Sequence, residues 1–355
     1  MTNIENFKSI VKRKGYQWMP FSYGMCESLA SRFQEFINQQ HIQMDVAVKE
    51  VNIPSIRPKA IPECEFQKYY KDYHFKPGTI IDEYGVAHEP GSEAAFHMTK
   101  MYHPMESFDS VEQILAYPFM DYTGSDDTEQ KQAVLQAHAA DLVAFGNMQC
   151  TIWEHSWYLR GMENLMMDMM SEDDMATVLL DKITDNAVIT ASAYASSGVD
   201  VLFLGDDIGM QKTIMMSLEL YRHWLKPRLK RVIDAAKKIK PDILVFYHSC
   251  GYIEPFIPDL IEVGVDVLNP VQPECMDFGK LHEMYGDRLS FHGTIGTQTT
   301  MPFGTPDDVK KEVYKNLDIA GEKGGLLVSP THLLEPEVPV ENVLAYIKAC
   351  QEYTK

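Results

Sequence analysis

The stretch VDVLFLGDD, residues 199–207, runs from an apolar, strand-like segment straight into two carboxylates. The same change from apolar to metal-binding or acid-type residues returns in ILVFYHSC (243–250), VDVLN (265–269), LSFH (289–292) and GLLVSPTH (325–332). Helix-like segments separate these runs, so the repeating unit is strand, polar residue, helix. The carboxyl ends of parallel strands face one side of an α/β fold, and catalytic side chains collect there. The recurrence predicts an enzyme with a metal site.

The alternation of strands and helices also indicates the fold class. Short connections of this kind imply parallel strands, in either a closed barrel or a doubly wound open sheet. No G-x-G-x-x-G sequence and no P-loop follows any of the strands, which removes the usual nucleotide-binding reason for an open sheet. Because polar residues at successive strand ends converge best on a barrel axis, we expect an α/β protein with a (β/α)8 TIM-type barrel.

The first 140 residues do not repeat this unit. We expect them to form an N-terminal α/β decoration on the main barrel body, residues 141–355, within a single structural domain. The segment EYGVAHE (83–89) is a candidate hairpin strand, and Ser110 is a candidate N-cap of the helix that follows it in SVEQILAYP. In the second half, Pro227 should kink or divide the long helix predicted over residues 217–239.

Composition excludes several classes of protein. The 355 residues carry 32 Lys and Arg against 51 Asp and Glu, a formal net charge of −19, which argues against a nucleic-acid partner. No apolar run approaches the ~18 residues that a membrane span needs. The charged N-terminus does not resemble a secretory signal, so we expect a cytoplasmic protein whose six cysteines are free thiols.

The pair His248-x-Cys250 supplies two metal ligands on one strand-end turn. The motif alone is weak, because a small cysteine at a strand end is most often a packing residue. His332 adds a third ligand if the barrel brings the strands together. Three protein ligands and an open fourth position are the pattern of catalytic zinc sites.

The adjacent carboxylates Asp206 and Asp207 have several candidate roles. One of them is a candidate fourth ligand, an orienting partner of a histidine, or a general acid or base. The competing interpretation is that one of the two simply caps the turn that follows the strand.

Residues near other strand ends are candidates for substrate binding. His292, which Gly293 follows, is a candidate catalytic or binding group, although a buried histidine with all its hydrogen bonds satisfied is an equal alternative. Trp153, Tyr158 and Arg160 follow an earlier strand and would form an aromatic wall with one cation, suited to an anionic or aromatic molecule. The competing interpretation is that Trp157 and Tyr158 belong to a helix core and that Arg160 is a surface charge. The full set of substrate-binding candidates is Trp153, Tyr158, Arg160, Asn269 and Gln298.

Several of these segments together resemble the uroporphyrinogen decarboxylase superfamily. The resemblance lies in LFLGDDIGMQ (202–211), YRHWLKPRLKRVIDAAKK (221–238), YHSCGYIEPFIPDLIEVGVDVLNPVQP (247–273) and FHGTIGTQTTMPFGTP (291–306). It implies a (β/α)8 barrel. One branch of that superfamily contains zinc-dependent methyltransferases that exchange methyl groups with a corrinoid protein, and those enzymes carry an H-x-C motif and a later Ser-Pro-Gly-Cys turn.

This chain matches the first of these motifs and departs from the second. His248-Ser249-Cys250 corresponds to H-x-C, whereas Ser329-Pro330-Thr331-His332 has a histidine where the family has its second cysteine. The N-terminal segment MPFSYGMCESLASRF (19–33) also lacks the Arg-Gln-Ala-Gly-Arg-Tyr motif of true porphyrinogen decarboxylases. Porphyrin decarboxylation is therefore not the expected activity.

The resemblance implies a zinc-dependent methyltransferase that works with a corrinoid protein. One thiolate and two imidazoles leave about one positive charge on Zn2+, which favours polarising the oxygen of a methyl donor. We therefore expect O-demethylation of a small methylated, in particular methoxylated, substrate, with the methyl group passing to a cobamide on the partner. Alternatives are a cofactor-free decarboxylase using Arg160 with Asp206 or Asp207, and a barrel that binds a ligand or corrinoid protein without turnover. A homodimer is left open.

Overall fold

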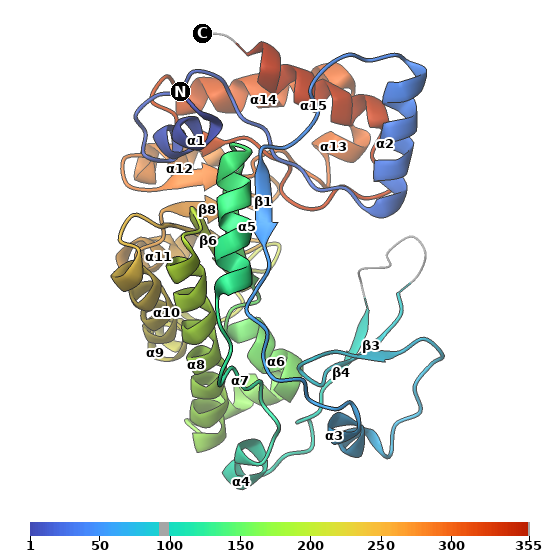
Figure 1. Cartoon of the computed structure of the whole chain (residues 1–355), viewed down its shortest axis with the longest axis vertical. Helices are drawn as coiled ribbons and strands as arrows, with labels where there is room; N and C mark the ends of the chain where they lie inside the picture. Colours follow the sequence, from blue (N-terminus) through green and yellow to red (C-terminus); the bar gives the residue numbers. More distant parts are fainter. Residues whose placement is uncertain (92–98, 354–355) are drawn as a thin grey trace.

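A seven-stranded parallel sheet forms the centre of the molecule in the computed structural model, which describes residues 1–91 and 99–353 (Figure 1). Its strands lie in the order β1 (Glu50–Ile53), β5 (Val143–Gln149), β6 (Val201–Gly205), β7 (Leu244–His248), β8 (Val267–Asn269), β9 (Ser290–His292) and β10 (Leu326–Leu327). Every ladder in this sheet is parallel. The five runs that we expected to be adjacent parallel strands therefore are adjacent and parallel.

The sheet curls around an apolar interior. Side chains two residues apart along β5, β6 and β7 point to the same side, and they meet β10 in one cluster. The first helix, α1 (Asn3–Val11), closes the amino-terminal end of this space with its own apolar residues. The shared cluster consists of Phe7, Ile10, Val11, Val143, Phe145, Val201, Leu244, Phe246, Val267 and Leu327. A barrel-like core results, closed at its amino-terminal end by α1.

The expected count of eight strands is not reached in the described part of the chain. No ladder joins β10 to β1 there, and an irregular segment around residues 20–25 lies between them. Ser22 donates to Glu50 of β1 at 2.5 Å, while the Tyr346 hydroxyl donates to the carbonyls of both Ser22 and Val328. Pro20 lacks a ladder donor, and this segment forms only a single bridge, from Met25 to Leu334.

Helices cover the outside of the sheet. The helices α8, α10 and α11 lie next to the strands along one side of the sheet (Figure 1). The helices of the chain are α2 (Glu27–Gln39), α3 (Cys64–Gln67), η1 (Lys68–Tyr70), α4 (Val111–Leu115), α5 (Thr128–Ala139), α6 (Trp153–Arg160), α7 (Met162–Met170), α8 (Asp174–Ser197), α9 (Leu218–Trp224), α10 (Lys226–Ile239), η2 (Glu254–Phe256), α11 (Ile257–Val263), α12 (Phe278–Tyr285), α13 (Thr300–Phe303), α14 (Pro306–Ala320) and α15 (Val340–Glu352). Pro227 divides the long helical stretch as expected, because it stands in the first turn of α10, where a missing N–H costs nothing.

A small lobe protrudes from the barrel (Figure 1). It contains the antiparallel sheet of β2 (Ile80–Ile81), β3 (Ala87–Glu89) and β4 (Lys100–Tyr102). The hairpin strand expected in residues 83–89 is β3, and Ser110 is the N-cap of α4. Because α1 and β1 belong to the barrel, the boundary near residue 140 stays a prediction rather than an observed division.

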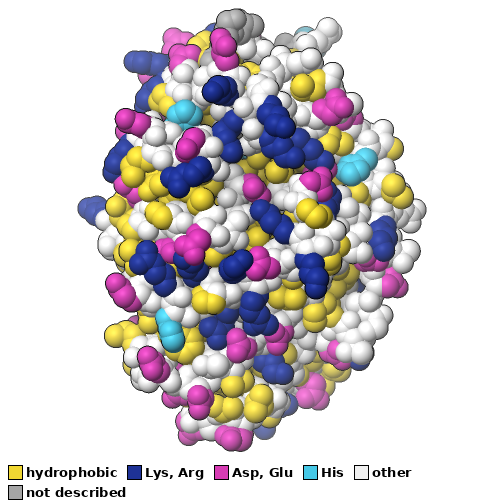
Figure 2. All heavy atoms as spheres, turned by 90° about the vertical axis from the view of Figure 1, so that its left-hand side faces the viewer, with side chains coloured by type: hydrophobic (Ala, Val, Ile, Leu, Met, Phe, Trp, Pro, Cys, Tyr) yellow, Lys and Arg dark blue, Asp and Glu magenta, His cyan; other side chains and the backbone are white. Residues whose placement is uncertain are grey.

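Oppositely charged side chains alternate on the helical face of the molecule. Figure 2 shows that basic and acidic groups are interspersed there instead of forming one patch. On α10, Arg228 pairs with Asp181 and Arg231 with Asp185, so ion pairs connect α10 to α8. No helix in the described ranges is long and apolar enough to cross a membrane.

Candidate metal centre and active site

The register of the sheet brings the site residues into one layer. Gly205 of β6 is paired with His248 of β7, and His248 is paired with Asn269 of β8. All three are inward positions at the carboxyl ends of their strands. A Cβ atom on Gly205 would lie 2.6 Å from the Cβ of His248, so a residue without a side chain is needed there. The absence of a side chain on one strand makes room for the imidazole of the next.

Three potential metal ligands converge above this layer. The ligand atoms of Asp207, His248 and Cys250 all lie within 4.8 Å of one another. His248 Nε2 is 3.5 Å from Cys250 Sγ and 3.7 Å from Asp207 Oδ1. When a tetrahedral zinc ion forms bonds of about 2.0 Å to nitrogen and 2.3 Å to sulfur, the nitrogen and the sulfur lie about 3.5 Å apart. The donor set and its spacing therefore fit a zinc ion.

The backbone of the two ligand loops supports this arrangement. The N–H of Cys250 donates to Asp207 Oδ1 at 2.7 Å, which joins the turn after β6 to the turn after β7. Gly251 has a φ of +84°, and an added Cβ would lie 2.8 Å from the carbonyl oxygen of Met210. Only glycine adopts this conformation easily in so close a contact. The short loops are thus packed against each other and hold the ligands in place.

Asn269 determines the tautomers of two histidines. Its Oδ1 can only accept, so the Nδ1 of His248 donates to it across 2.6 Å. The proton is thereby fixed on Nδ1, and Nε2 keeps its lone pair for a metal. The amide nitrogen of Asn269 donates to Nδ1 of His292 at 2.6 Å, so the proton of neutral His292 resides on Nε2.

Burial keeps these groups in their uncharged forms. Desolvation lowers the pKa of His248 despite the opposing effects of Asp207 and Asn269, and it lowers the pKa of His292 to about 4. Burial likewise raises the pKa of the Cys250 thiol, and the charge of Asp207 raises it further. Neutral imidazole is the form that binds a metal, whereas the thiol must lose a proton on binding.

His332 lines the same cavity as the three convergent ligands. It is close enough for its charge to lower the pKa of His248. It does not belong to the group of ligand atoms within 4.8 Å, in which Asp207 is the third member. Its role as a ligand stays a prediction, and Asp207 joins it as a candidate for the same coordination position.

A large cavity opens above the convergent ligands. Its volume is about 700 Å³, and its lining includes His248, Asn269, His292 and His332. Three carboxylates also line it, namely Glu50, Glu154 and Asp207. Among the described residues, no lysine or arginine does so. The cavity is therefore rich in ligands for a cation and has no basic side chain to bind a carboxylated substrate.

The two carboxylates predicted as a pair have separate roles. Asp206 is buried and accepts hydrogen bonds from the backbone N–H groups of Ile152 and Glu154, so it caps the start of α6. This is a capping role, although for a helix earlier in the chain rather than for the following turn. Asp207 lines the cavity, as expected for one of the pair.

Arg160 has a structural role, which corrects its assignment to substrate. Its guanidinium is buried, pairs with Asp168 at 2.8 Å and donates to the carbonyls of Met105 and Phe108. It therefore links α6 and α7 to the small lobe. Arg160 does not line the cavity, and because its side chain is buried the alternative interpretation as a surface charge is also wrong.

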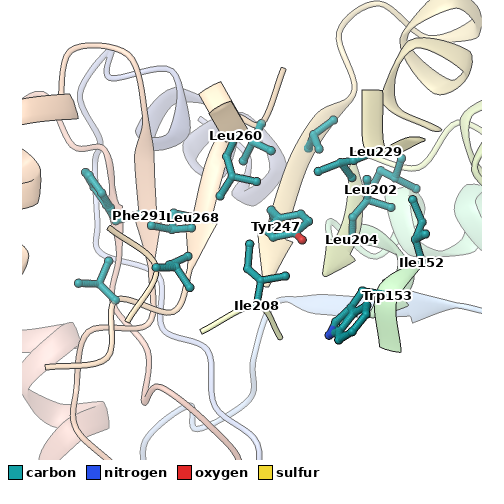
Figure 3. Close-up of a cluster of buried hydrophobic side chains, with 14 of the residues drawn as sticks. Ile152, Trp153, Leu202, Leu204, Ile208, Leu229, Tyr247, Leu260, Leu268 and Phe291 are labelled. Carbon is teal, nitrogen blue, oxygen red and sulfur yellow. The ribbon is translucent and has the colours of Figure 1, made fainter. Parts of the chain in front are cut away.

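Trp153 and Gln298 also require correction as substrate-binding residues. Trp153 has an exposed fraction of 0% and packs in the large apolar core with Ile152 and Leu204 (Figure 3). Gln298 is exposed and does not line the cavity; its backbone N–H donates to Glu274. Tyr158 lies behind the cavity wall, where its hydroxyl donates to Glu154 at 2.9 Å. It contacts the cavity lining through that carboxylate and through the Cys150 thiol, 3.5 Å from the same hydroxyl.

Sequence analysis missed Glu154 and Cys150. Glu154 accepts from the backbone N–H of Asp207 at 3.1 Å, and burial raises the pKa of its carboxyl group. Cys150 also lines the cavity and has a φ of +63°, a strained value for a residue other than glycine. Both follow β5, where the strand-end rule led instead to the aromatic residues and the arginine of the next helix.

A curled parallel sheet with a cavity lined by potential metal ligands at the carboxyl ends of its strands defines a TIM-barrel-like class. The sequence profile of the uroporphyrinogen decarboxylase (URO-D) family matches residues 135–353, which include strands β5 to β10. The chain belongs to that family.

The similar proteins include methyltransferases as well as uroporphyrinogen decarboxylases. The chain is 28% identical over 205 residues to a methylated-thiol–coenzyme M methyltransferase of Methanosarcina mazei, a match that covers 55% of this chain and 49% of that protein. It is 25% identical over 195 residues to the methylcobamide:CoM methyltransferase MtaA of Methanosarcina barkeri, covering 55% and 54%. A uroporphyrinogen decarboxylase of Pelodictyon phaeoclathratiforme is 28% identical over 191 residues, covering 52% and 51%. The matches span about half the length of these relatives.

A solved structure supports the fold over the whole chain. A methyltransferase from Methanosarcina mazei superimposes with a TM-score of 0.66 and covers 99% of both chains at 17% identity. At this identity the likeness establishes the architecture alone. The first 134 residues, which lie outside the family match, thus also have counterparts in a known fold.

Proposed function

We propose that this protein is a zinc-dependent methyltransferase that moves a methyl group from a small methylated compound to a corrinoid protein. The observation that carries the proposal is the convergence of Asp207, His248 and Cys250 beneath a 700 Å³ cavity. Two of the similar proteins are named as methyltransferases, and one of them acts on a methylcobamide. A methyl ether is the donor class that we favour.

The residues of the chain have distinct parts in this reaction. His248 and Cys250 would hold the zinc ion, with Asp207 or His332 beside them. Zinc bound there supplies a Lewis acid that polarises the heteroatom of the donor. Asn269 keeps the lone pair of His248 free, and His292 carries its proton on Nε2, where it can donate a hydrogen bond to the donor or to the leaving oxygen.

The identity of the third ligand affects the direction of transfer. Cys250 with two imidazoles leaves about one positive charge on Zn2+, which favours polarising a methyl donor. Cys250 with Asp207 and one imidazole balances both charges, which weakens that preference. The donor-to-corrinoid direction therefore depends on His332 as a ligand, and metal analysis of variants distinguishes the two sets.

The composition of the cavity weighs against the decarboxylase alternative. A decarboxylase of carboxylated substrates needs a positive group to bind the carboxylate, and Arg160 was the candidate for that part. Arg160 instead pairs with Asp168, donates to backbone carbonyls and lies outside the cavity lining. The described cavity lining contains carboxylates and imidazoles without lysine or arginine.

The test is spectroscopic. Zinc-loaded protein is mixed with cob(I)alamin and a panel of methyl ethers, thioethers and methylamines, and formation of methylcobalamin is followed by its absorbance. We expect methylation with at least one ether and none with Cys250→Ser. Carbon dioxide release from a carboxylated substrate by metal-free protein, without methylation from any donor, would support the decarboxylase instead.

A further inference from the structure

A second cavity of about 440 Å³ lies between the small lobe and the barrel. The lobe side is lined by Ser55–Pro58, Glu83, Tyr84, Met120 and Tyr122, and the barrel side by Asn147–Thr151, His155, Ile183, Asn186, Ala187 and Thr190. It shares Asn147, Gln149 and Cys150 with the 700 Å³ cavity described above. We call that first space the metal-lined cavity, after the potential metal ligands in its lining. The two spaces therefore adjoin at the end of β5, where the same residues line both.

We propose that this second cavity is the specificity pocket for the part of the donor that is not transferred, and that it selects an uncharged, planar body. The inference rests on the proposed function, because it assigns the donor's methyl group to the metal-lined cavity. It adds the class of molecule that the methyl group comes from and the residues that recognise it.

The first support is a flat platform inside the cavity. The rings of Tyr84 and His155 are stacked, with centroids 4.3 Å apart and planes at 28°. Tyr84 comes from the lobe and His155 from α6, so the platform forms only where the two parts meet. A planar ligand can stack on the outer face of such a pair.

The second support is the chemical character of the walls. Burial lowers the pKa of His155 to about 4, so its ring is neutral. Within the described ranges, no hydrogen bond of this ring is seen, which leaves both nitrogens for a ligand. Arg57 is the one cation of the described lining, and its side chain is 80% exposed and paired with Glu129. A carboxylate or sulfonate entering the cavity would find no buried countercharge.

The third support is the strained residue at the junction. Cys150 adopts a φ of +63°, and its thiol lies 3.5 Å from the hydroxyl of Tyr158. Residues are held in such conformations where the surrounding structure fixes them, which is common next to binding sites. Here the conformation turns the chain at the point where the two cavities adjoin, close to Glu154 and Asp207 of the metal-lined side.

The experiment compares binding with turnover. Binding of guaiacol and of 4-methoxybenzoate to the full zinc-loaded chain is measured by calorimetry, and methylcobalamin formation is measured with guaiacol and with methanol. We expect guaiacol to bind at least tenfold more tightly than 4-methoxybenzoate. Ala187→Phe, which fills the cavity from α8, should weaken guaiacol binding at least tenfold and lower the guaiacol-to-methanol rate ratio by a similar factor.

Matched variants guard against a folding artefact. Ile189→Phe adds a ring to the 44%-exposed residue two positions along α8 and should leave guaiacol binding unchanged. Tyr84→Ala should also weaken guaiacol binding. Tyr84→Phe keeps the ring and should bind guaiacol as the unaltered protein does. Circular dichroism and thermal unfolding establish that each variant is folded.

The outcomes separate the two proposals. If guaiacol binds and Ala187→Phe abolishes that binding but no donor is ever demethylated, the pocket assignment holds and the proposed methyl transfer fails. If methylcobalamin forms from other donors while folded Ala187→Phe and Tyr84→Ala bind guaiacol as the unaltered protein does, the pocket assignment is overturned. Equal or tighter binding of 4-methoxybenzoate would overturn the selection for uncharged bodies.

Discussion

Asn269 governs the chemistry of two histidines with a single amide. Its oxygen accepts from His248 and its nitrogen donates to His292, both at 2.6 Å. One histidine is thereby prepared as a metal ligand and the other as a hydrogen-bond donor. Second partners of this kind raise ligand basicity and fix ring orientation, so they affect metal affinity nearly as much as the ligands themselves.

The identity of the metal ligands is the first prediction. Cys250→Ser should abolish stoichiometric zinc, because the hydroxyl is a much poorer ligand than a thiolate. His332→Ala and Asp207→Asn then discriminate between the two candidates for the third position, since replacing the ligand removes a bond to the metal and should lower zinc affinity more than replacing the other residue. Zinc content after dialysis, measured by atomic emission, provides the readout.

The control for this prediction is Cys275→Ser, which removes a partly exposed thiol outside the convergent group. It should retain one zinc per chain. Full zinc retention in both Cys250→Ser and His332→Ala would show that these residues are packed rather than coordinating.

For individual residues, the sequence predicted the site more reliably at strand ends than in helices. His248, Asn269 and His292 were identified because their positions follow strands, and all three line the cavity. Trp153 and Arg160 were misassigned because residue type alone does not reveal whether a helix turns a side chain toward the core. Arg160 in particular pairs with Asp168 one helix away, a partner that no local pattern indicates.

The elements themselves follow from simple periodicity. Alternate residues along β7 divide cleanly, with Leu244, Phe246 and His248 pointing inward and Val245 and Tyr247 pointing to the outer core. The inward series passes from apolar to metal-binding along the strand. The same strand thus stabilises the barrel at one end and supplies the site at the other.

The interior layer of the barrel gives the second prediction. Phe246 is fully buried, and its ring is within 6.1 Å of those of Phe7 and Phe145. Phe246→Ala should lower the free energy of unfolding by about 3–5 kcal/mol. The reason is that the space left by the missing ring lies between paired strands that cannot close around it. Urea denaturation at pH 7 gives the value.

The matched substitution is Phe303→Ala, which truncates a ring that is 79% exposed. Its effect should stay within about 0.5 kcal/mol. A Phe246→Ala value as small as that of the control would mean that the interior of the barrel repacks around the missing ring.

Strand order was predictable at the level of elements, whereas the strand count was not. The five later strands were found because each is apolar, short and followed by a helix. The position next to β10 is filled by an irregular segment around residues 20–25, which contains Pro20 and Gly24. Tyr346 and Ser22 make long-range side-chain hydrogen bonds in this segment, and such contacts leave no periodic trace in the sequence.

For the whole molecule, the two ends of the barrel have opposite roles. The carboxyl ends of the strands carry the metal-lined cavity, and the small lobe encloses the second cavity beside it. The amino-terminal end is closed by α1, which packs its apolar face inside the sheet. A fold predictor working from the first 140 residues alone would not connect α1 to strands more than 200 positions later.

A buried ion pair holds the closed end of the barrel together. Asp200, just before β6, has a side chain that is 1% exposed and lies 2.6 Å from Lys8 of α1. It also accepts from the backbone N–H of Ala144 in β5 at 3.0 Å and contacts His138 of α5 at 2.9 Å. One carboxylate therefore joins four separate elements.

The third prediction concerns the pH dependence of stability. Burial by itself would raise the pKa of Asp200, but the bonds from Ala144 and Lys8 outweigh it, and the pKa lies below its ordinary value. A carboxyl group whose pKa is depressed on folding stabilises the protein above its unfolded pKa, about 4, and loses that contribution as the pH falls through the folded value. Asp200→Asn should therefore cost about 2 kcal/mol at pH 7 and progressively less below pH 4.

The measurement is urea denaturation of the unaltered protein and of Asp200→Asn at pH 7, 5 and 3. Asp287→Asn removes a carboxylate that is 79% exposed and should make no measurable difference at any of these pH values. A deficit in Asp200→Asn that stayed the same at pH 3 would show that it arises from lost packing rather than from the charge. Because Lys8 belongs to α1, loss of the charge should also increase proteolysis at the N-terminus, which links the stability of the closed end of the barrel to a single titrating group.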